Sequence, residues 1–227
     1  MAKFHFVEDY QKNVKNLMAL HPIDEAMSLA VGGGYATIGE IEKDILLYAG
    51  LKQKMHLLDY GCGSGRLASA LSPELKLEYL GIDIVDELLE YAATKSPKNY
   101  KFINHQELNI PSKDEYFDMI CAFSLFTHLL QAETYLYLRD MHRVLKKDGV
   151  LVFSFLEFDL PAHWSIFEAT VEGQRNSTVP HLNMFMEKSV INIWAEKLGY
   201  KVIEIICGTE NKFNGKALGQ SLAILKK

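Results

Sequence analysis

One stretch near residue 60 constrains the fold more than any other part of the chain. Residues 55–60 form an apolar run that ends in a turn with glycines at alternate positions, Asp-Tyr-Gly-Cys-Gly-Ser-Gly at 59–65. Apolar residues such as Leu67 and Leu71 then recur at helical spacing. A strand that stops at glycines and enters a helix lets bare backbone approach a ligand. The stretch therefore predicts a strand, a tight turn and a helix, with a binding site at the turn.

Strand and helix patterns alternate along the rest of the chain. We expect strands at residues 55–60, 77–83, 100–103, 117–123, 150–155, 200–207 and 221–225. We expect helices at residues 8–20, 37–49, 86–94, 131–146 and 187–198, besides the helix after the glycine turn. The helix at 37–49 opens with Thr37 and Glu40, which have the spacing of a capping box. This alternation predicts a parallel sheet that helices cover on both faces.

The last two expected strands have no helix between them. The segment at 208–220 holds Asn214-Gly215, a pair that favours a hairpin. The final strand should therefore run antiparallel to its neighbours. The predicted fold is a doubly wound α/β domain with a seven-stranded, mostly parallel sheet and an antiparallel last strand.

The length of 227 residues suits one domain. We expect residues 1–50 to form an N-terminal helical cap and residues 157–185 to form a lid that binds the substrate. Aromatic residues gather there or just before it, and Phe155, Phe158 and Trp164 are candidates to line an acceptor pocket, although simple packing is an equal alternative.

Charge and composition exclude some classes of partner. The formal net charge is −5, so the chain lacks the basic footprint of a nucleic-acid binder. Its three cysteines show no metal-ligand or disulfide spacing. The first residues do not read as a secretory signal, and no apolar run reaches the ~20 residues of a membrane span. We expect a cytoplasmic protein with no integral membrane segment, present as a monomer or homodimer.

Two acidic residues accompany the glycine turn. Asp59 precedes the first glycine, and Asp83 ends the next strand, 18 residues beyond Gly65. A carboxylate at the end of the second strand can accept hydrogen bonds from both hydroxyls of a ribose. Arg66 stands where a nicotinamide-dependent dehydrogenase places its third glycine, which argues against that class. A tight turn without a ligand, with Asp83 as a helix cap, is the plainer alternative.

Four ordered motifs resemble those of class I S-adenosylmethionine-dependent methyltransferases. They are residues 57–67 around the glycine turn, Gly-Ile-Asp at 81–83, Phe-Asp-Met-Ile at 117–120, and Arg-Val-Leu-Lys-Lys-Asp-Gly-Val at 143–150. The last departs mildly from the family, which has Pro-Gly-Gly where this chain has Lys-Asp-Gly. The resemblance implies the Rossmann-like methyltransferase fold and S-adenosylmethionine as cofactor. It is specific to the superfamily and leaves the acceptor open: a small molecule, a sugar or a lipid-linked intermediate.

The resemblance also implies roles for individual residues. The turn would hold the methionine part of the cofactor, Asp83 would bind the ribose and Ile84 would pack on the adenine. Gln106 falls where many members carry an aspartate that meets the adenine amino group. The full set of expected cofactor residues is Asp59, Tyr60, Gly61, Cys62, Gly63, Gly65, Asp83, Ile84, Gln106, Glu107, Leu108, Phe123 and Ser124.

His128 is the leading candidate for a general base. It follows the fourth strand in Phe-Thr-His-Leu, at the edge of the sheet where ligands bind. The alternative for His128 is a buried histidine that orients a loop or caps the next helix. His163 is the second candidate, and its alternative is an exposed loop histidine. The glycines at 32–34 could form a gate, with Tyr35 touching the cofactor or the acceptor. The segment after strand four lacks an acidic cluster, so we expect no metal. A non-catalytic binding protein of the same fold is the main alternative function.

Overall fold

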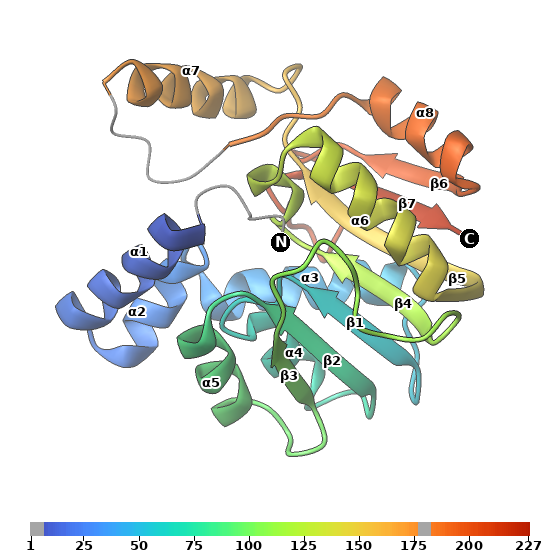
Figure 1. Cartoon of the computed structure of the whole chain (residues 1–227), viewed down its shortest axis with the longest axis horizontal. Coiled ribbons are helices and arrows are strands. Elements are labelled where there is room, and N and C mark those ends of the chain that lie inside the picture. Colours follow the sequence, from blue (N-terminus) through green and yellow to red (C-terminus); the bar gives the residue numbers. More distant parts are fainter. Residues whose placement is uncertain (1–6, 177–182) are drawn as a thin grey trace.

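A seven-stranded sheet forms the centre of the computed structural model, which describes residues 7–176 and 183–227 (Figure 1). Its strands are β1 (His56–Tyr60), β2 (Glu78–Asp83), β3 (Lys101–Asn104), β4 (Phe117–Ala122), β5 (Leu145–Phe155), β6 (Lys201–Ile206) and β7 (Ser221–Lys226). Their order is β3-β2-β1-β4-β5-β7-β6, and β7 alone among these strands runs in the opposite direction to the others. The predicted fold class is confirmed.

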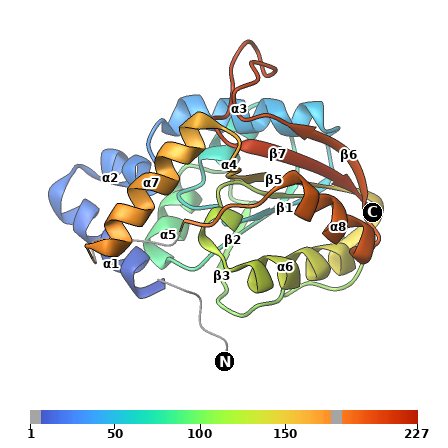
Figure 2. The ribbon, with the colours of Figure 1, turned by 90° about the horizontal axis from the view of Figure 1, so that it is seen from above.

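Helices cover both faces of the sheet. They are α1 (Val7–Leu20), α2 (Ile23–Ala30), α3 (Tyr35–Tyr48), α4 (Arg66–Leu71), α5 (Asp86–Thr94), α6 (Gln131–Val144), α7 (Pro161–Arg175) and α8 (Lys188–Leu198), with a short 3₁₀ turn at Phe126–His128. Figure 2 shows α3 and α4 on one face and α6 and α8 on the other. The helices α1 and α2 lie together at one end of the sheet, and α7 lies on that same side of the molecule (Figures 1 and 2).

The two faces follow from the alternation of side chains along each strand. Leu57 and Met119 belong to the core that α3 and α4 cover, whereas Leu58 and Ile120 belong to the core of α6 and α8. All four are buried, because both faces of a doubly wound sheet are covered. The same alternation places Asp59 on the face that α3 and α4 cover. Glu42 of α3 is a second acidic residue on this side of the sheet.

The connection between β6 and β7 contains the expected hairpin turn. Asn214 and Gly215 both have positive φ, +48° and +72°. Phe213 and Lys216 exchange two backbone hydrogen bonds across them, of 3.2 and 2.9 Å. Asparagine and glycine tolerate this left-handed backbone, which is why the pair favours a two-residue hairpin turn. The rest of the connection returns the chain to β7 beside β5.

The N-terminal helices differ from the prediction at the start of α3 and in the presence of α2. The helix expected at 37–49 starts at Tyr35, so Thr37 lies inside it and forms no capping box; Gly34, in the left-handed conformation, is the residue before the helix. The short α2 is absent from the prediction, because eight residues give too few turns for a clear periodic pattern.

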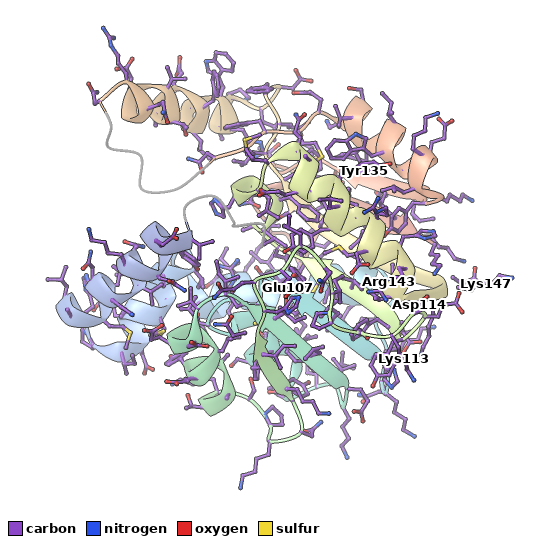
Figure 3. All side chains as sticks on the ribbon, in the orientation of Figure 1. Glu107, Lys113, Asp114, Tyr135, Arg143 and Lys147 are labelled. Atoms are coloured by element: carbon purple, nitrogen blue, oxygen red, sulfur yellow. The ribbon has the colours of Figure 1, made fainter. Side chains whose placement is uncertain are left out.

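The predicted helix 131–146 ends at Val144, and β5 begins at once with Leu145 rather than at 150. Arg143, in the last turn of α6, connects this helix end to the loop before β4. Its guanidinium contacts Asp140 at 2.6 Å and Asp114 at 2.7 Å. Figure 3 shows Arg143 and Asp114 together, on the side of the sheet away from α1 and α2. This arginine ties the loop before β4 to α6 and takes no part in the site.

Candidate functional site

A cavity of about 390 Å³ lies at the carboxyl ends of β1, β2 and β4. Residues that follow these strands line it, including Gly61, Asp83 and Ser124. The strand order reverses between β1 and β4, and ligands of open α/β sheets bind at such a switch point. The volume is typical of a site for a small organic molecule. The cavity at this switch point includes the glycine turn in its wall.

The three glycines of the turn all have positive φ: +81° at Gly61, +52° at Gly63 and +78° at Gly65. Side chains rarely adopt this backbone conformation. A Cβ at Gly63 would lie 2.6 Å from Val31 Cγ1, and a Cβ at Gly65 would lie 2.6 Å from Ala92 Cβ. Gly61 and Gly63 line the cavity, whereas Gly65 immediately precedes α4 and lets this helix approach α5. The glycines thus serve close packing around the site as well as access to it.

Asp83 joins the end of β2 to the glycine turn. Its Oδ2 accepts a hydrogen bond from the backbone N–H of Gly63 at 2.9 Å, and its Oδ1 accepts from Ile84 at 2.7 Å and Val85 at 3.1 Å. The residue is 8% exposed, and burial raises its pKa while the three N–H donors oppose that rise. Three of about four acceptor positions are in use, so one position on Oδ2 remains for a ligand hydroxyl, where the sequence suggested both oxygens.

Asp59 is buried at the end of β1. Its Oδ2 accepts a 2.6 Å hydrogen bond from Tyr79, and its Oδ1 lies 3.5 Å from the thiol of Cys121. The β1–β4 register pairs Asp59 with Cys121, which explains that contact. Burial raises the pKa of Asp59 to about 7, although the hydrogen bond from Tyr79 opposes the shift.

A buried ion pair completes this end of the cavity. Arg66, the first residue of α4, contacts Glu42 of α3 through Nε at 2.9 Å and Nη2 at 2.5 Å. It also donates to the carbonyl oxygen of Val31 at 2.7 Å. Burial raises the pKa of Glu42, and the adjacent guanidinium lowers it. Neither Glu42 nor Arg66 is among the predicted site residues. The position of Glu42, a charged residue beside the apolar stripe of Ile41 and Ile45, is the sequence feature that could have indicated its role.

The N-terminal helices cover the cavity. Tyr10 and Asn13 of α1 line it, together with Val31 after α2. Gln11 on α1 donates a hydrogen bond to the carbonyl oxygen of Ile84 at 3.3 Å, next to Asp83. Burial and the neighbouring Asp83 raise the pKa of Tyr10 well above its usual value. These contacts come from packing between segments that are distant in the chain, so no local sequence motif predicts them.

The end of β4 forms the opposite part of the cavity. Phe123, Ser124, Leu125 and His128 all line it. Ser124 has φ of +56°, a backbone strain of the kind found at ligand sites. His128 is exposed and stands at the end of the 3₁₀ turn. The structure therefore brings His128 into the same cavity as the glycine turn and Asp83.

Several predicted residues lie outside the cavity lining. Gln106 donates to the Ile84 carbonyl at 3.5 Å and to Asn104 at 3.3 Å, and the neighbouring His105 lines the cavity instead. Glu107 lies on the loop after β3, on the α6 side of the ribbon (Figure 3). The residues of the predicted set that do not line the cavity are Gly65, Gln106, Glu107, Leu108, Tyr35, Phe155, Phe158, Trp164 and His163.

His163 is a buried structural histidine, which corrects its expected role as a base. It is 1% exposed, although it lies on the otherwise solvent-facing α7. Its Nδ1 accepts from the backbone N–H of Glu157 at 3.0 Å, and its Nε2 contacts the carbonyl oxygen of Gly219 at 2.8 Å. Both ring nitrogens are engaged, so neither can take a proton from a substrate. The ring instead anchors α7 to the loop before β7.

Tyr35 and the aromatic candidates also have definite surroundings. The hydroxyl of Tyr35 donates to the carbonyl oxygen of Ser64 at 3.1 Å, so this tyrosine supports the glycine turn from behind. Phe155 is buried in the core of β5. Phe158 stacks on Phe185 at 4.9 Å, and Trp164 lies 6.3 Å from Phe158. Phe158 and Trp164 are 38% and 44% exposed, so this cluster presents an apolar surface outside the cavity lining.

Among residues 7–176 and 183–227, no group of three or more histidine, cysteine, aspartate or glutamate side chains is placed to hold a metal ion. In the same part of the chain, none of the helices combines the length and apolar character that a membrane crossing requires.

Comparison with known proteins finds methyltransferases. Residues 58–153 match the methyltransferase domain family. A ubiquinone biosynthesis O-methyltransferase of Coxiella burnetii is 25% identical over 160 residues, a match that covers 66% of this chain and 65% of that protein. The match thus covers 65% of that relative's length, slightly less than two thirds.

Solved structures share the fold. A chain in the complex between the Haloferax volcanii Trm112 methyltransferase activator and a methyltransferase has a TM-score of 0.66 at 14% identity, with 100% of this chain and 99% of that chain covered. A TehB-like methyltransferase of Corynebacterium glutamicum has a TM-score of 0.59 at 19% identity, with 97% and 96% covered. Residues 58–153 thus match the methyltransferase domain family, the chain as a whole shares the fold of S-adenosylmethionine-dependent methyltransferases, and S-adenosylmethionine is accordingly its cofactor.

The residues around the cavity fit this cofactor. The molecule carries an ammonium group, a carboxylate, a ribose diol and an adenine. Asp59 and Glu42 are carboxylates that suit the ammonium, and Arg66 suits the carboxylate. Asp83 retains an acceptor position for a ribose hydroxyl, and Ile84 offers an apolar contact for the adenine. The cavity lining thus holds positive and negative groups of the kinds that this cofactor requires.

Proposed function

We propose that the chain is an active methyltransferase that transfers the methyl group of S-adenosylmethionine to a hydroxyl group of a small-molecule acceptor. One observation carries this proposal: the Asp83 carboxylate of β2 accepts a hydrogen bond from Gly63 in the turn after β1. That bond unites the ribose-binding group and the glycine turn in the wall of one cavity. The name of the Coxiella burnetii relative, an O-methyltransferase, supports oxygen as the methylated atom.

On the cofactor side, Asp83 holds the ribose, and Asp59, Glu42 and Arg66 hold the amino-acid part. The cofactor supplies a methyl group on a sulfonium, which is electrophilic. The protein's contribution is to align the acceptor with this methyl group, since approximation lowers much of the barrier in such displacements. Tyr10 of α1 closes the cavity over Asp83 and helps to exclude water.

On the acceptor side, His128 is the proposed general base. An alcohol must lose its proton as its oxygen is methylated, and an imidazole is suited to accept it near neutral pH. His128 lines the cavity next to Ser124 and Leu125, at the end of β4. The pathway we propose needs no metal ion, since the histidine supplies the base.

We further propose that the aromatic cluster of Phe158, Trp164, Phe167 and Phe185 covers the acceptor. The rings of Trp164 and Phe167 lie 5.2 Å apart, and Phe167 and Phe185 lie 5.5 Å apart. Exposed aromatic surface beside a cavity suits a partly apolar small molecule better than a polar macromolecule. The net charge of −5 also argues against a nucleic-acid acceptor.

The proposal is tested in two measurements on the purified chain. Isothermal titration with S-adenosylhomocysteine should show binding, whereas NAD should not bind. The chain should then transfer tritium from S-adenosyl-[methyl-³H]methionine to a protein-free and nucleic-acid-free metabolite extract, and the His128→Ala variant should not. Binding of S-adenosylhomocysteine without any labelled product would favour the non-catalytic alternative, and binding of NAD alone would overturn the cofactor.

A further inference from the structure

A polar bridge spans the ends of three strands beside the cavity. Ser124 follows β4, Ser154 lies on β5 and Gln220 immediately precedes β7. The backbone N–H of Ser124 donates to Ser154 Oγ at 2.7 Å. Gln220 Oε1 then accepts from Ser154 Oγ at 2.7 Å and from Ser124 Oγ at 3.3 Å. The amide oxygen of Gln220 thus accepts hydrogen bonds from both serine hydroxyl groups.

This bridge fixes which way the Gln220 amide points. Ser154 is fully buried, and its oxygen already accepts the N–H of Ser124, so its own hydroxyl hydrogen needs an acceptor. Rotating the amide by 180° would remove that acceptor and leave a buried hydroxyl unsatisfied, which is costly. Oε1 therefore faces the serines, and Nε2 carries the two free N–H groups. Among the described residues no protein acceptor is bonded to Gln220 Nε2, and Gln220 lines the cavity.

The position of Gln220 separates it from the cofactor groups. β7 is three strands from β1 in the sheet order, a lateral distance of about 14 Å at the usual strand spacing. Asp83 ends β2, on the other side of β1. The Gln220 side chain reaches back over β5 to Ser124, so its amide stands at the β4 end of the cavity, with Leu125 and His128. Since the proposed base His128 lies at this end, a ligand group bound there would belong to the methyl acceptor.

We propose that Gln220 is a specificity-determining residue that donates a hydrogen bond from Nε2 to an oxygen of the methyl acceptor. This inference rests on the proposed function and names the acceptor class more closely. The acceptor carries a hydroxyl group for methylation at His128 and a second oxygen function, such as a carbonyl, for Gln220. Its apolar body contacts Phe123, Leu125 and Leu129, which line the same cavity.

The test uses three phenols of nearly equal shape that differ in one group. They are 3-hydroxyacetophenone, which offers a carbonyl acceptor, 3-hydroxybenzylamine, which offers a donor, and 3-ethylphenol, which offers neither. Each is titrated into the complex of the chain with S-adenosylhomocysteine. The wild type should bind the ketone about tenfold more tightly than 3-ethylphenol, the effect of one neutral hydrogen bond.

Gln220→Glu is the decisive variant, because a carboxylate preserves the bonds from both serines and replaces the N–H donor by an acceptor. It should reverse the order and bind 3-hydroxybenzylamine best, with unchanged affinity for S-adenosylhomocysteine. Gln53→Glu, an exposed glutamine before β1, is the matched control and should behave as the wild type. Equal binding of the three phenols by the wild type, or a ketone preference that survives in Gln220→Glu, overturns the inference. Failure of the wild type to bind S-adenosylhomocysteine would instead overturn the proposed function.

Discussion

Replacing Asp59 by asparagine gives a test that depends on burial of a single carboxyl group. Asp59 is 3% exposed, and burial raises its pKa from 3.8 to about 7. Asparagine has nearly the same shape and keeps an oxygen that can accept the hydrogen bond from Tyr79. The substitution therefore removes the ionisation and preserves the packing. Any pH-dependent difference between the two proteins reports on this one group.

The size of the effect follows from the two pKa values. Between pH 3.8 and about 7 the unfolded chain has lost the Asp59 proton while the native protein keeps it. The unfolded state then binds fewer protons, so the free energy of unfolding falls as pH rises, by about 1.4 kcal/mol per pH unit. The slope flattens above the native pKa. Between pH 5 and pH 8 the wild type should lose about 3 kcal/mol through this group.

The assay is urea unfolding of the cofactor-free wild type and Asp59→Asn across that pH range. The variant should gain stability relative to the wild type as pH rises, and the difference should level off above the native pKa. Asp86→Asn, at an exposed position at the start of α5, serves as the matched control. A difference between wild type and Asp59→Asn that stays constant with pH would refute the argument from burial.

Three further substitutions probe the site. Gly63→Ala places a Cβ 2.6 Å from Val31 Cγ1 on a backbone with φ of +52°. The substitution should therefore cost roughly 1–3 kcal/mol of stability and lower the affinity for S-adenosylhomocysteine. An unchanged affinity in calorimetry would show that the turn is not part of the site. Arg66→Met leaves Glu42 buried without its partner and should cost roughly 3–5 kcal/mol in urea unfolding, part of which Glu42→Gln should restore in the double variant. If the single and double variants are equally unstable, the pair is not coupled. His128→Ala should lower turnover by roughly 10²–10⁴-fold with little change in S-adenosylhomocysteine affinity, and wild-type turnover would end its candidacy as base.

The parts of the site that the sequence predicts are those whose signal is local. The glycine turn and Asp83 lie at strand ends, where a run of apolar residues stops at glycine or at an acidic residue. The antiparallel β7 follows from the missing helix before it and from Asn214-Gly215. Each of these signals depends on neighbours in the chain, so pattern and backbone preference suffice to interpret it.

The parts that escaped prediction depend on contacts between distant segments. Glu42 and Arg66 meet only because α3 packs on α4, and Tyr10 reaches the cavity only because α1 and α2 fold over it. His163 has the sequence context of a loop residue, yet burial and two hydrogen bonds make it structural. Gln220 belongs to no motif at all. Tertiary packing decides the role of these residues, and a single sequence does not encode it in any local pattern.

The central claim is that Asp83 and the glycine turn together form the cofactor site. Calorimetric titration of S-adenosylhomocysteine into Asp83→Asn, beside Asp86→Asn as the exposed control, measures it directly. We predict that the Asp83 variant loses roughly 1–3 kcal/mol of binding free energy, about 5- to 150-fold in affinity, while the control binds as the wild type does. Wild-type affinity in a folded Asp83→Asn protein would contradict the account.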